Sequence, residues 1–285
     1  MEIEIANNFY GLRFVAKDID KYVYGEIYGR ESSYRKESLL PLIRDGTVVE
    51  IGAHKGFFSI LAGSVAERVI SFEPNKENYD YFTRNIKLNN MGHITAINKA
   101  VSNTEDNRTF TVSNITPARH TLISSSFSGS GKAVEVECTT LAAILRDPNY
   151  MIDRIRLLKV DCEGAEYDIF LGCDPAVFQK IDAVVLEMHE ISSIPHKMTE
   201  LVQFFKQVGY TAEIYDERTM ESMHLWMGYF AKPWLSNRLL SKRPRHLWMR
   251  WFARIGCAVM EYGRWKLRRL IEKMSTGLWK AWKKG

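Results

Sequence analysis

A carboxylate and two glycines, closely spaced in the sequence, are the clearest candidates for residues that bind a ligand. In VVEIGAHKGFFSI, Glu50 ends an apolar run, and Gly52 and Gly56 bracket a turn into a helix that we expect to begin near Phe57. Glycine permits a tight turn and a close approach of the backbone to a ligand. This segment therefore predicts a ligand-binding turn between a buried strand and a helix.

The spacing within this turn favours one class of ligand. An E-x-G-x-x-x-G turn differs from the G-x-G-x-x-G turn of dinucleotide-binding folds, which admits a pyrophosphate. S-adenosylmethionine has no phosphate and carries a cationic amino group, so an acid at Glu50 is consistent with it. Taken alone, the motif also fits a glycine turn that only connects a strand to a helix.

A second acid strengthens the cofactor prediction. Glu73, in FEPN, follows the glycine turn by about 20 residues, where such folds place an acid on ribose hydroxyls. As an alternative, Glu73 could be a helix N-terminal acid, with Pro74 in the first turn and Asn75 as the N-cap. The end of the third strand is expected beside the adenine. The predicted cofactor-binding residues are Glu50, Gly52, His54, Gly56, Phe57, Glu73, Pro74, Asn75, Asn98 and Ala100.

Two further segments carry the candidate catalytic residues. LLKVDCEGAEYDIF places Asp161 and Glu163 just beyond a strand, and LEMHE places His189 at the end of the next one. Methyl transfer from a sulfonium is an in-line displacement, so the enzyme aligns the acceptor oxygen and removes its proton. We predict that Asp161, Glu163 and His189 are catalytic. The alternatives are helix caps for the two acids and a satisfied polar loop residue for His189.

These residues require a fold that brings strand ends together. Short apolar runs alternate with longer amphipathic stretches, which predicts βα units in a doubly wound, mostly parallel α/β sheet. Its predicted strands are Val48–Ile51, Val69–Phe72, Ile94–Asn98, Arg156–Val160, Ala183–Met188, Thr211–Tyr215 and Met227–Ala231. The polar, glycine-rich stretch Ser113–Lys132 is expected to be a surface loop or lid. We predict an N-terminal cap over residues 1–43, a catalytic domain over 44–233 and a tail over 234–285.

The tail differs from the rest of the chain in charge. From Ala231 onward there are fifteen basic and two acidic residues, a formal charge of +13, and residues 1–230 carry −8; six of the seven tryptophans also lie in this part. Apolar residues recur at spacings of three and four from Trp248 to Leu278, which predicts a basic amphipathic helix lying in an anionic membrane surface. The alternative is a helical hairpin packed on the domain or on a second subunit of a homo-oligomer.

Composition gives a coarse expectation for location. The four cysteines show neither zinc-site spacing nor the density of a disulfide scaffold, which fits a reducing compartment. No signal peptide or apolar run long enough to cross a bilayer is evident. We expect a cytoplasmic protein that is peripheral on the inner face of the cell membrane.

Four ordered blocks resemble the FkbM-type methyltransferases: VEIGAHKGFFS, SFEPNKENYDYFTRNIKLN, LLKVDCEGAEYDIF and VVLEMHE. The resemblance implies a Rossmann-like class I fold, S-adenosylmethionine as the cofactor, and largely O-directed transfer, in many members to sugars of glycolipids or polysaccharides. It assigns the cofactor acid to Glu50 and the ribose acid to Glu73. One departure is the His54-Lys55 pair, which is often Asn-Ile or Asn-Val in the family.

The resemblance leaves the use of a metal open. Related sugar methyltransferases use a magnesium-type ion, and hard ligands for one would be available from Asp161, Glu163, Glu187 and His189, although the spacing does not require it.

The expected function is O-methylation of a sugar hydroxyl of a glycan or glycolipid at the membrane surface. O-methylation of a soluble secondary metabolite, with the tail used for oligomerisation, is the alternative. An RNA methyltransferase or nucleic-acid-binding protein is disfavoured, because residues 1–230 would repel phosphates and the chain lacks an N-P-P-Y type motif.

Overall fold

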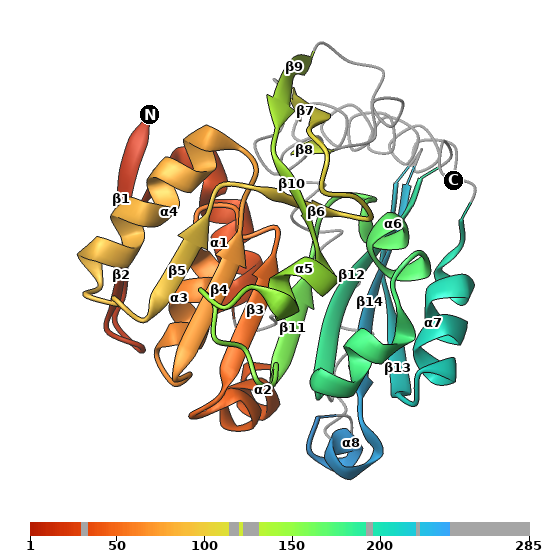
Figure 1. The fold of residues 1–285 in the computed structure, drawn as a ribbon. Coiled ribbons are helices and arrows are strands. Elements are labelled where there is room, and N and C mark those ends of the chain that lie inside the picture. The colour runs from red at the N-terminus through yellow and green to blue at the C-terminus, as the bar shows by residue number, and fades with distance from the viewer. Residues whose placement is uncertain (30–33, 114–119, 122–130, 192–195, 221–222, 240–285) are drawn as a thin grey trace, which may run out of the picture. The chain divides into compact units, whose positions relative to one another are not determined.

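A seven-stranded sheet forms the centre of the protein (Figure 1). The computed structural model describes residues 1–29, 34–113, 120–121, 131–191, 196–220 and 223–239. In spatial order the strands are β13 (Thr211–Met220), β14 (Met223–Ala231), β12 (Ala183–Ile191), β11 (Leu157–Val160), β3 (Thr47–Ile51), β4 (Arg68–Phe72) and β5 (Ile94–Ile97). The five strands from β12 to β5 are parallel to one another, and β14 runs antiparallel to both of its neighbours, β12 and β13. The predicted doubly wound, mostly parallel sheet is therefore confirmed.

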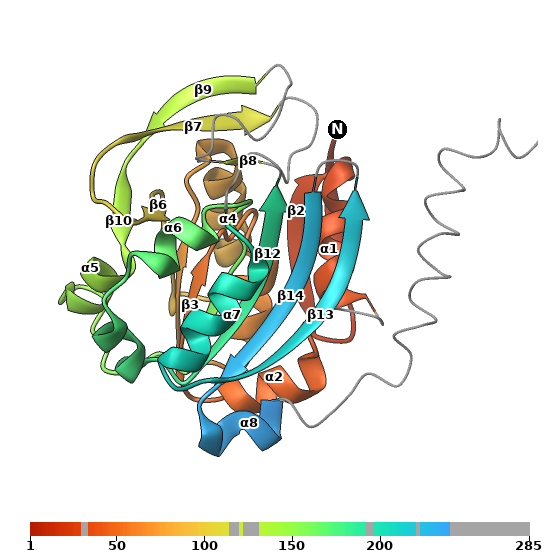
Figure 2. The same ribbon diagram turned by 90° about the vertical axis from the view of Figure 1, so that its right-hand side faces the viewer.

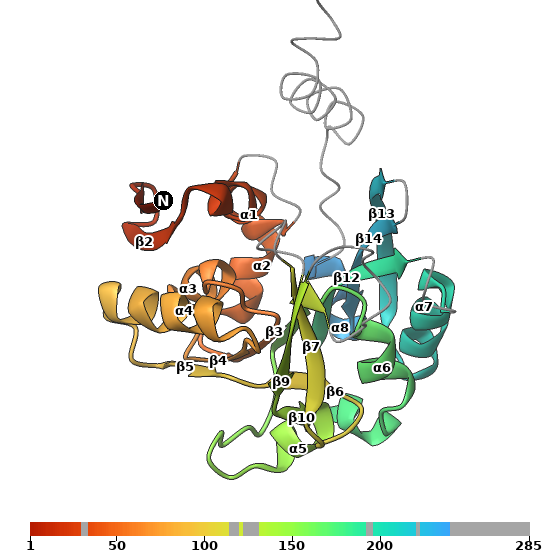
Figure 3. The ribbon, with the colours of Figure 1, turned by 90° about the horizontal axis from the view of Figure 1, so that it is seen from above.

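Both faces of the sheet are covered, which explains why its strands are apolar without alternation. Val48 faces one hydrophobic core and Val49 faces the other. Figure 3 shows α3 and α4 on one side of the sheet and α5 and α6 on the other. The helices of the first core are α1 (Lys21–Tyr28), α2 (Lys36–Ile43), α3 (Phe57–Gly63), α4 (Lys76–Leu88) and α8 (Pro233–Leu239). The helices of the second core are α5 (Leu141–Arg146), α6 (Glu166–Leu171), η2 (Pro175–Lys180) and α7 (Met198–Gln207).

The order of the strands creates a switch point beside β3. The chain passes from β3 outward to β4 and β5, and then returns to build β11 and β12 on the other side of β3. Loops that leave β3 and β11 consequently go to opposite sides, and ligands of such sheets bind beyond the strand ends at a switch point of this kind. The glycine turn follows β3, and Asp161 follows β11.

Smaller sheets lie beyond the carboxyl ends of the main strands, where Figure 2 shows β7 and β9 above the end of β12. They are formed by β6 (Ala100–Ser102) with β10 (Cys138–Thr140), and by β7 (Arg108–Ser113) with β8 (His120–Thr121) and β9 (Gly131–Val136). The prediction that the whole of Ser113–Lys132 lacks regular structure was wrong at both ends and at His120–Thr121. Backbone pairing to β7 makes these residues strands despite their polar composition. The rest of that stretch lies outside the described residues.

The N-terminal segment packs on the first core. It consists of β1 (Glu2–Asn7), β2 (Leu12–Lys17), η1 (Asp18–Asp20), α1 and α2. The ring of Phe14, in β2, lies 5.3 Å from that of Phe57 in α3. Helix α8, at the start of the predicted tail, also joins this core through Leu235 and Leu239.

The remaining tail, residues 240–285, lies outside the described residues, so the predicted amphipathic helix stays a prediction. Among the helices that are described, none is long and apolar enough to cross a bilayer.

Candidate functional site

The glycine turn adopts backbone conformations that explain its sequence. Gly52 and Gly56 have φ angles of 81° and 79°, in the left-handed region. A Cβ atom at Gly52 would lie 1.8 Å from the carbonyl oxygen of Asp161, and one at Gly56 would lie 2.0 Å from the ring of Phe82. His54 also has a positive φ, of 52°. The turn is therefore pressed against both the end of β11 and helix α4.

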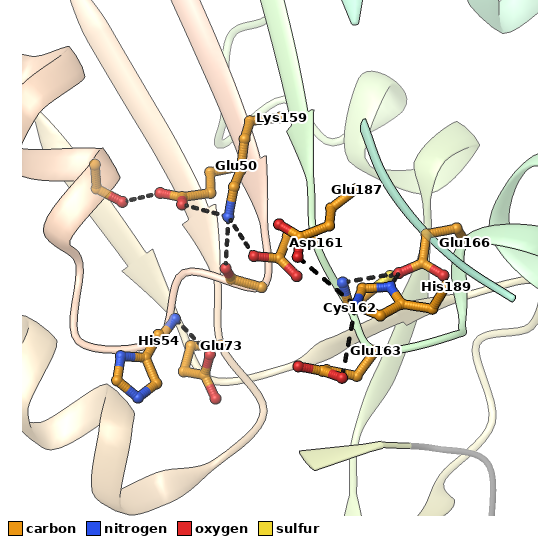
Figure 4. A network of polar contacts seen from close by, with 12 residues as sticks. Glu50, His54, Glu73, Lys159, Asp161, Cys162, Glu163, Glu166, Glu187 and His189 are labelled. Carbon is orange, nitrogen blue, oxygen red and sulfur yellow. Dashed lines mark hydrogen bonds and ion pairs between the residues drawn. The ribbon is translucent and has the colours of Figure 1, made fainter. Parts of the chain in front are cut away.

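Glu73 lies directly beside this turn, as predicted for the ribose acid (Figure 4). Its two carboxylate oxygens accept the backbone N–H groups of His54, at 2.7 Å, and Asn75, at 2.8 Å. The side chain of Asn98 donates to the carbonyl oxygens of Glu73 and Pro74, at 2.8 and 3.0 Å. Burial raises the pKa of Glu73 to about 7, against the opposing effect of these backbone donors. Each carboxylate oxygen retains acceptor capacity for a hydroxyl group.

Asn75 is the N-cap of α4, because its side chain accepts the N–H of Asn78 at 3.0 Å. Two other predicted cofactor residues are held in packed regions. Phe57 is buried in the first core, and Ala100 is buried in β6, where its N–H donates to the backbone carbonyl oxygen of Glu137. Phe57 and Ala100 are therefore buried and pack beneath the site. The predicted cofactor residues that the structure brings together are Gly52, His54, Glu73, Pro74, Asn75 and Asn98.

Glu50 is buried beneath the turn and is bound by protein groups. Its carboxylate accepts the hydroxyl of Ser59 and forms an ion pair with Lys159, at 3.2 Å. Lys159 also lies 3.4 Å from Asp161 and donates to the carbonyl oxygen of Gly52 at 3.2 Å. Contact of Glu50 with the cofactor stays a prediction; the contacts present join β3 to β11 beneath the glycine turn.

Lys159 was missed at the sequence level, although a lysine inside the apolar run LLKV is the signal that could have identified it. Its side chain is 4% exposed. Burial by itself lowers the pKa of a lysine, but the carboxylates of Asp161, Glu50 and Glu187 outweigh this effect and raise the pKa of Lys159. Lys159 therefore stays positively charged between the two strands and orients Asp161.

The predicted catalytic residues converge around the ends of β11 and β12 (Figure 4). Nδ1 of His189 lies 3.0 Å from Glu166, and its Nε2 lies 3.6 Å from Glu163 and 4.0 Å from Glu187. Glu163 reaches this position through a positive φ of 53°, next to Gly164. The sequence prediction that Asp161, Glu163 and His189 lie close together at the sheet edge is in agreement with this geometry; their catalytic roles stay predictions.

Charges within this cluster perturb one another strongly. Burial lowers the pKa of His189, but the carboxylates of Glu166 and Glu163 outweigh it and raise the pKa well above its usual value. Burial raises the pKa of Glu187 well above its usual value, and Asp161 adds to this effect. Four carboxylates and an imidazole that perturb one another at neighbouring strand ends are typical of a catalytic site.

The same cluster offers the ligands that a hard divalent cation prefers. Among the residues that the structure describes, Asp161, Glu187 and His189 each provide one ligand atom, and these atoms lie within 4.8 Å of one another. Glu166 holds the other ring nitrogen of His189, as carboxylates do for many metal-binding histidines. The residues present therefore fit a divalent ion.

Comparison with known proteins agrees with the site. Residues 50–212, more than half of the chain, match the Methyltransferase FkbM domain. Methyltransferase sdnD of Sordaria araneosa is 26% identical over 218 residues, which cover 66% of this chain and 82% of that protein. Methyltransferase 1 of Beauveria bassiana (strain ARSEF 2860) is 26% identical over 167 residues, covering 52% of this chain and 66% of that protein.

A solved structure of precorrin-6y C5,15-methyltransferase from Geobacter metallireducens covers 71% of this chain and 89% of its own, with 14% identity and a TM-score of 0.40. The domain match spans the glycine turn, Glu73 and the cluster around His189. This chain belongs to the FkbM methyltransferase family and is an S-adenosylmethionine-dependent methyltransferase.

Proposed function

We propose that the protein transfers the methyl group of S-adenosylmethionine to a sugar hydroxyl. The observation that carries this proposal is the group of carboxylates at the ends of β11 and β12, next to the glycine turn. Asp161, Glu163 and Glu187 surround His189 there, and their side chains are 28%, 16% and 17% exposed. Carboxylates accept hydrogen bonds from the adjacent hydroxyl groups of a sugar, and they are suited to take the proton that O-methylation releases.

Asp161 is the general base in this proposal. Its carboxylate is the most exposed of the three and is oriented by the ammonium group of Lys159, 3.4 Å away. His189 is more deeply buried, and the acids around it favour its protonated form. In that form the imidazole donates a hydrogen bond from Nε2. We propose that this bond orients either the acceptor oxygen or one of the neighbouring carboxylates. Glu163 lies 3.6 Å from Nε2 of the imidazole, and we assign it a second hydrogen bond to the acceptor.

A divalent cation is a second element of the proposal. Asp161, Glu187 and His189 would hold it, with the imidazole in its neutral form in place of the protonated form described above, and when bound a magnesium-type ion would lower the pKa of a coordinated hydroxyl group. The protein residues would then position the acceptor against the methyl group, which contributes a large share of the barrier reduction in a displacement reaction.

The acceptor is proposed to be membrane-associated, because of the composition of the C-terminal part of the chain. From Ala231 onward this part carries a formal charge of +13 and six tryptophans. Basic residues attract anionic lipid, and tryptophan favours the interface between lipid and water. We therefore propose a glycan or glycolipid acceptor at the cytoplasmic face of the membrane.

The test is a transfer assay with S-adenosylmethionine labelled in its methyl group. The purified full chain is incubated with fractionated membrane glycolipids and, in parallel, with soluble metabolite fractions from the same cells. We expect the label in glycolipid, and expect hydrolysis and mass spectrometry to give an O-methyl sugar. The Asp161→Asn variant is the control, because any label that it incorporates is transferred independently of this site. Label in a soluble metabolite alone would overturn the glycolipid acceptor, and an N-methyl product would overturn the hydroxyl assignment.

A further inference from the structure

Three buried polar side chains connect the N-terminal segment to the glycine turn and to α4. Asp20 lies at the end of η1, Lys55 in the turn, and Asn78 in the first turns of α4. The Nζ atom of Lys55 lies 3.0 Å from Oδ1 of Asp20 and 3.0 Å from Oδ1 of Asn78. Asp20 and Lys55 are each 1% exposed. A buried ion pair of this kind is held in one geometry by its surroundings.

The relay of these three residues ends at the proposed ribose acid. Burial raises the pKa of Glu73, and the side chains of Asn78 and Lys55 oppose this effect, so both act on its carboxylate. The residue before Lys55 in the turn, His54, donates its backbone N–H to Glu73. The orientation of Lys55 and that of Glu73 are thereby coupled through the backbone and through α4.

Other contacts from the N-terminal segment converge on the same turn. The side chain of Asn85 accepts from Val15 N at 2.7 Å and donates to the carbonyl oxygen of Lys55 at 2.9 Å. The hydroxyl of Tyr28 donates to the carbonyl oxygen of Phe57 at 3.0 Å. The N-terminal segment, which precedes the matched family domain at residues 50–212, therefore contacts the start of α3 directly through Tyr28 and the turn through Asn85.

The type of contact argues for a positioning role beyond stability. Replacing both members of a buried ion pair by apolar residues of similar size is often neutral or stabilising, whereas removing one member leaves a buried charge without its partner, so stability and cofactor affinity are measured separately below. What a charged pair adds is one defined orientation of the turn. That orientation determines where the N–H of His54 and the carboxylate of Glu73 lie.

We propose that Asp20 is a positioning residue of the S-adenosylmethionine site, which acts through Lys55 and Asn78 to hold Glu73 and the glycine turn in the binding conformation. The inference rests on the role of Glu73 as the ribose acid. It assigns to the N-terminal segment a part in cofactor binding.

The experiment compares isosteric variants by calorimetric titration of the full chain with S-adenosylmethionine. Asp20→Asn and Lys55→Met are expected to raise the Kd by about tenfold or more, because the free energy that holds the turn in the binding conformation is coupled to cofactor binding. Asp182→Asn is the matched control, because Asp182 is equally buried and pairs with Arg154 and Arg156 away from the crevice. It is expected to lower the melting temperature without changing the Kd.

Two further readouts separate positioning from general destabilisation. In the double variant the two effects on Kd should be less than additive, because both substitutions break one relay. In Lys55→Met the pH midpoint of cofactor binding should rise, because the ammonium no longer stabilises the Glu73 carboxylate. If Asp20→Asn does not fold, Asn78→Ser interrupts the relay at its other end.

An unchanged Kd in folded Asp20→Asn and Lys55→Met, together with weakened binding in Glu73→Ala, would overturn the relay and leave the ribose assignment standing. An unchanged Kd in Glu73→Ala would instead overturn the ribose assignment, and with it this inference. If Asp182→Asn raised the Kd as much as Asp20→Asn does, the weaker binding would be a consequence of lower protein stability. That result would also overturn the positioning role.

Discussion

Nδ1 of His189 lies 3.0 Å from Oε1 of Glu166, and both side chains are almost fully buried. The same carboxylate oxygen accepts the backbone N–H groups of Cys162 and Gly164, at 3.1 and 3.2 Å. Glu166 therefore joins β12 to the loop after β11 and fixes the imidazole so that Nε2 faces the other acids. The orientation of the proposed acceptor site depends on this one carboxylate.

The first prediction is that Glu166→Gln lowers the free energy of unfolding by about 2 kcal/mol, because a charged hydrogen bond at a buried site is lost. Denaturant unfolding measures the change. Glu200→Gln is the matched control, since Glu200 forms the same kind of pair with His196 on the surface, at 2.9 Å, and should show no measurable loss. Equal stability of Glu166→Gln and the parent protein would contradict the role given to this pair.

The second prediction concerns Glu73. Glu73→Ala should weaken S-adenosylmethionine binding while the protein remains folded, because the ribose hydroxyls lose their acceptor. Calorimetry gives the affinity, and circular dichroism confirms the fold. Unchanged affinity in the folded variant would remove the ribose assignment.

The pH dependence of binding follows from the same residue and is the third prediction. Burial raises the pKa of Glu73 to about 7 from an ordinary value of 4.5, so protonation competes with ribose binding. Affinity should decline as the pH falls through about 7 and level off above it. Because the folded-state pKa lies above the ordinary value, the free energy of unfolding of the unliganded protein should decrease as the pH rises from 4.5 to about 7. Glu73→Gln should bind weakly with no such midpoint; a midpoint that persists would assign the titration to another group.

The fourth prediction addresses catalysis. Asp161→Asn and His189→Ala should each lower the rate of methyl transfer by about 10²-fold or more, with cofactor affinity largely retained. Single-turnover assays with the true acceptor measure the rate separately from binding. A variant with near-normal turnover would show that the substituted residue is only structural. Loss of parent activity with a chelator and its return with magnesium would indicate that these residues bind a metal.

The fifth prediction tests the predicted tail. Leu239 is fully buried, and its carbonyl oxygen accepts from Arg35, so a truncation at residue 233 would remove part of the core. We expect residues 1–242, one compact unit, to fold and to bind S-adenosylmethionine. This truncation should lose the flotation with anionic liposomes that we expect of the full chain, and high salt should weaken that flotation. A full chain that stays in solution at low salt would contradict membrane binding.

The sequence alone determined which elements form and where the chemical groups stand along them. Apolar runs predicted all seven strands of the main sheet, and Glu73 and Asp161 directly follow β4 and β11, as predicted. The prediction that His189 ends its strand was wrong, because pairing with β14 extends β12 to Ile191 and places His189 inside the strand. The features predicted correctly depend on short-range patterns, which a single sequence displays directly. The glycine turn was predictable for the same reason, since its spacing reflects local backbone geometry.

Only the tertiary structure decided which groups pair. Glu50 meets Lys159 because β3 and β11 are neighbours in the sheet, although more than a hundred residues separate them in the chain. Lys55 meets Asp20 because the N-terminal segment folds back over the glycine turn. Such contacts depend on strand order and on how segments pack, and no local periodicity encodes them. The sequence therefore identified the acids of the site, and the tertiary structure decided which of them are held by internal partners and which remain available for a ligand.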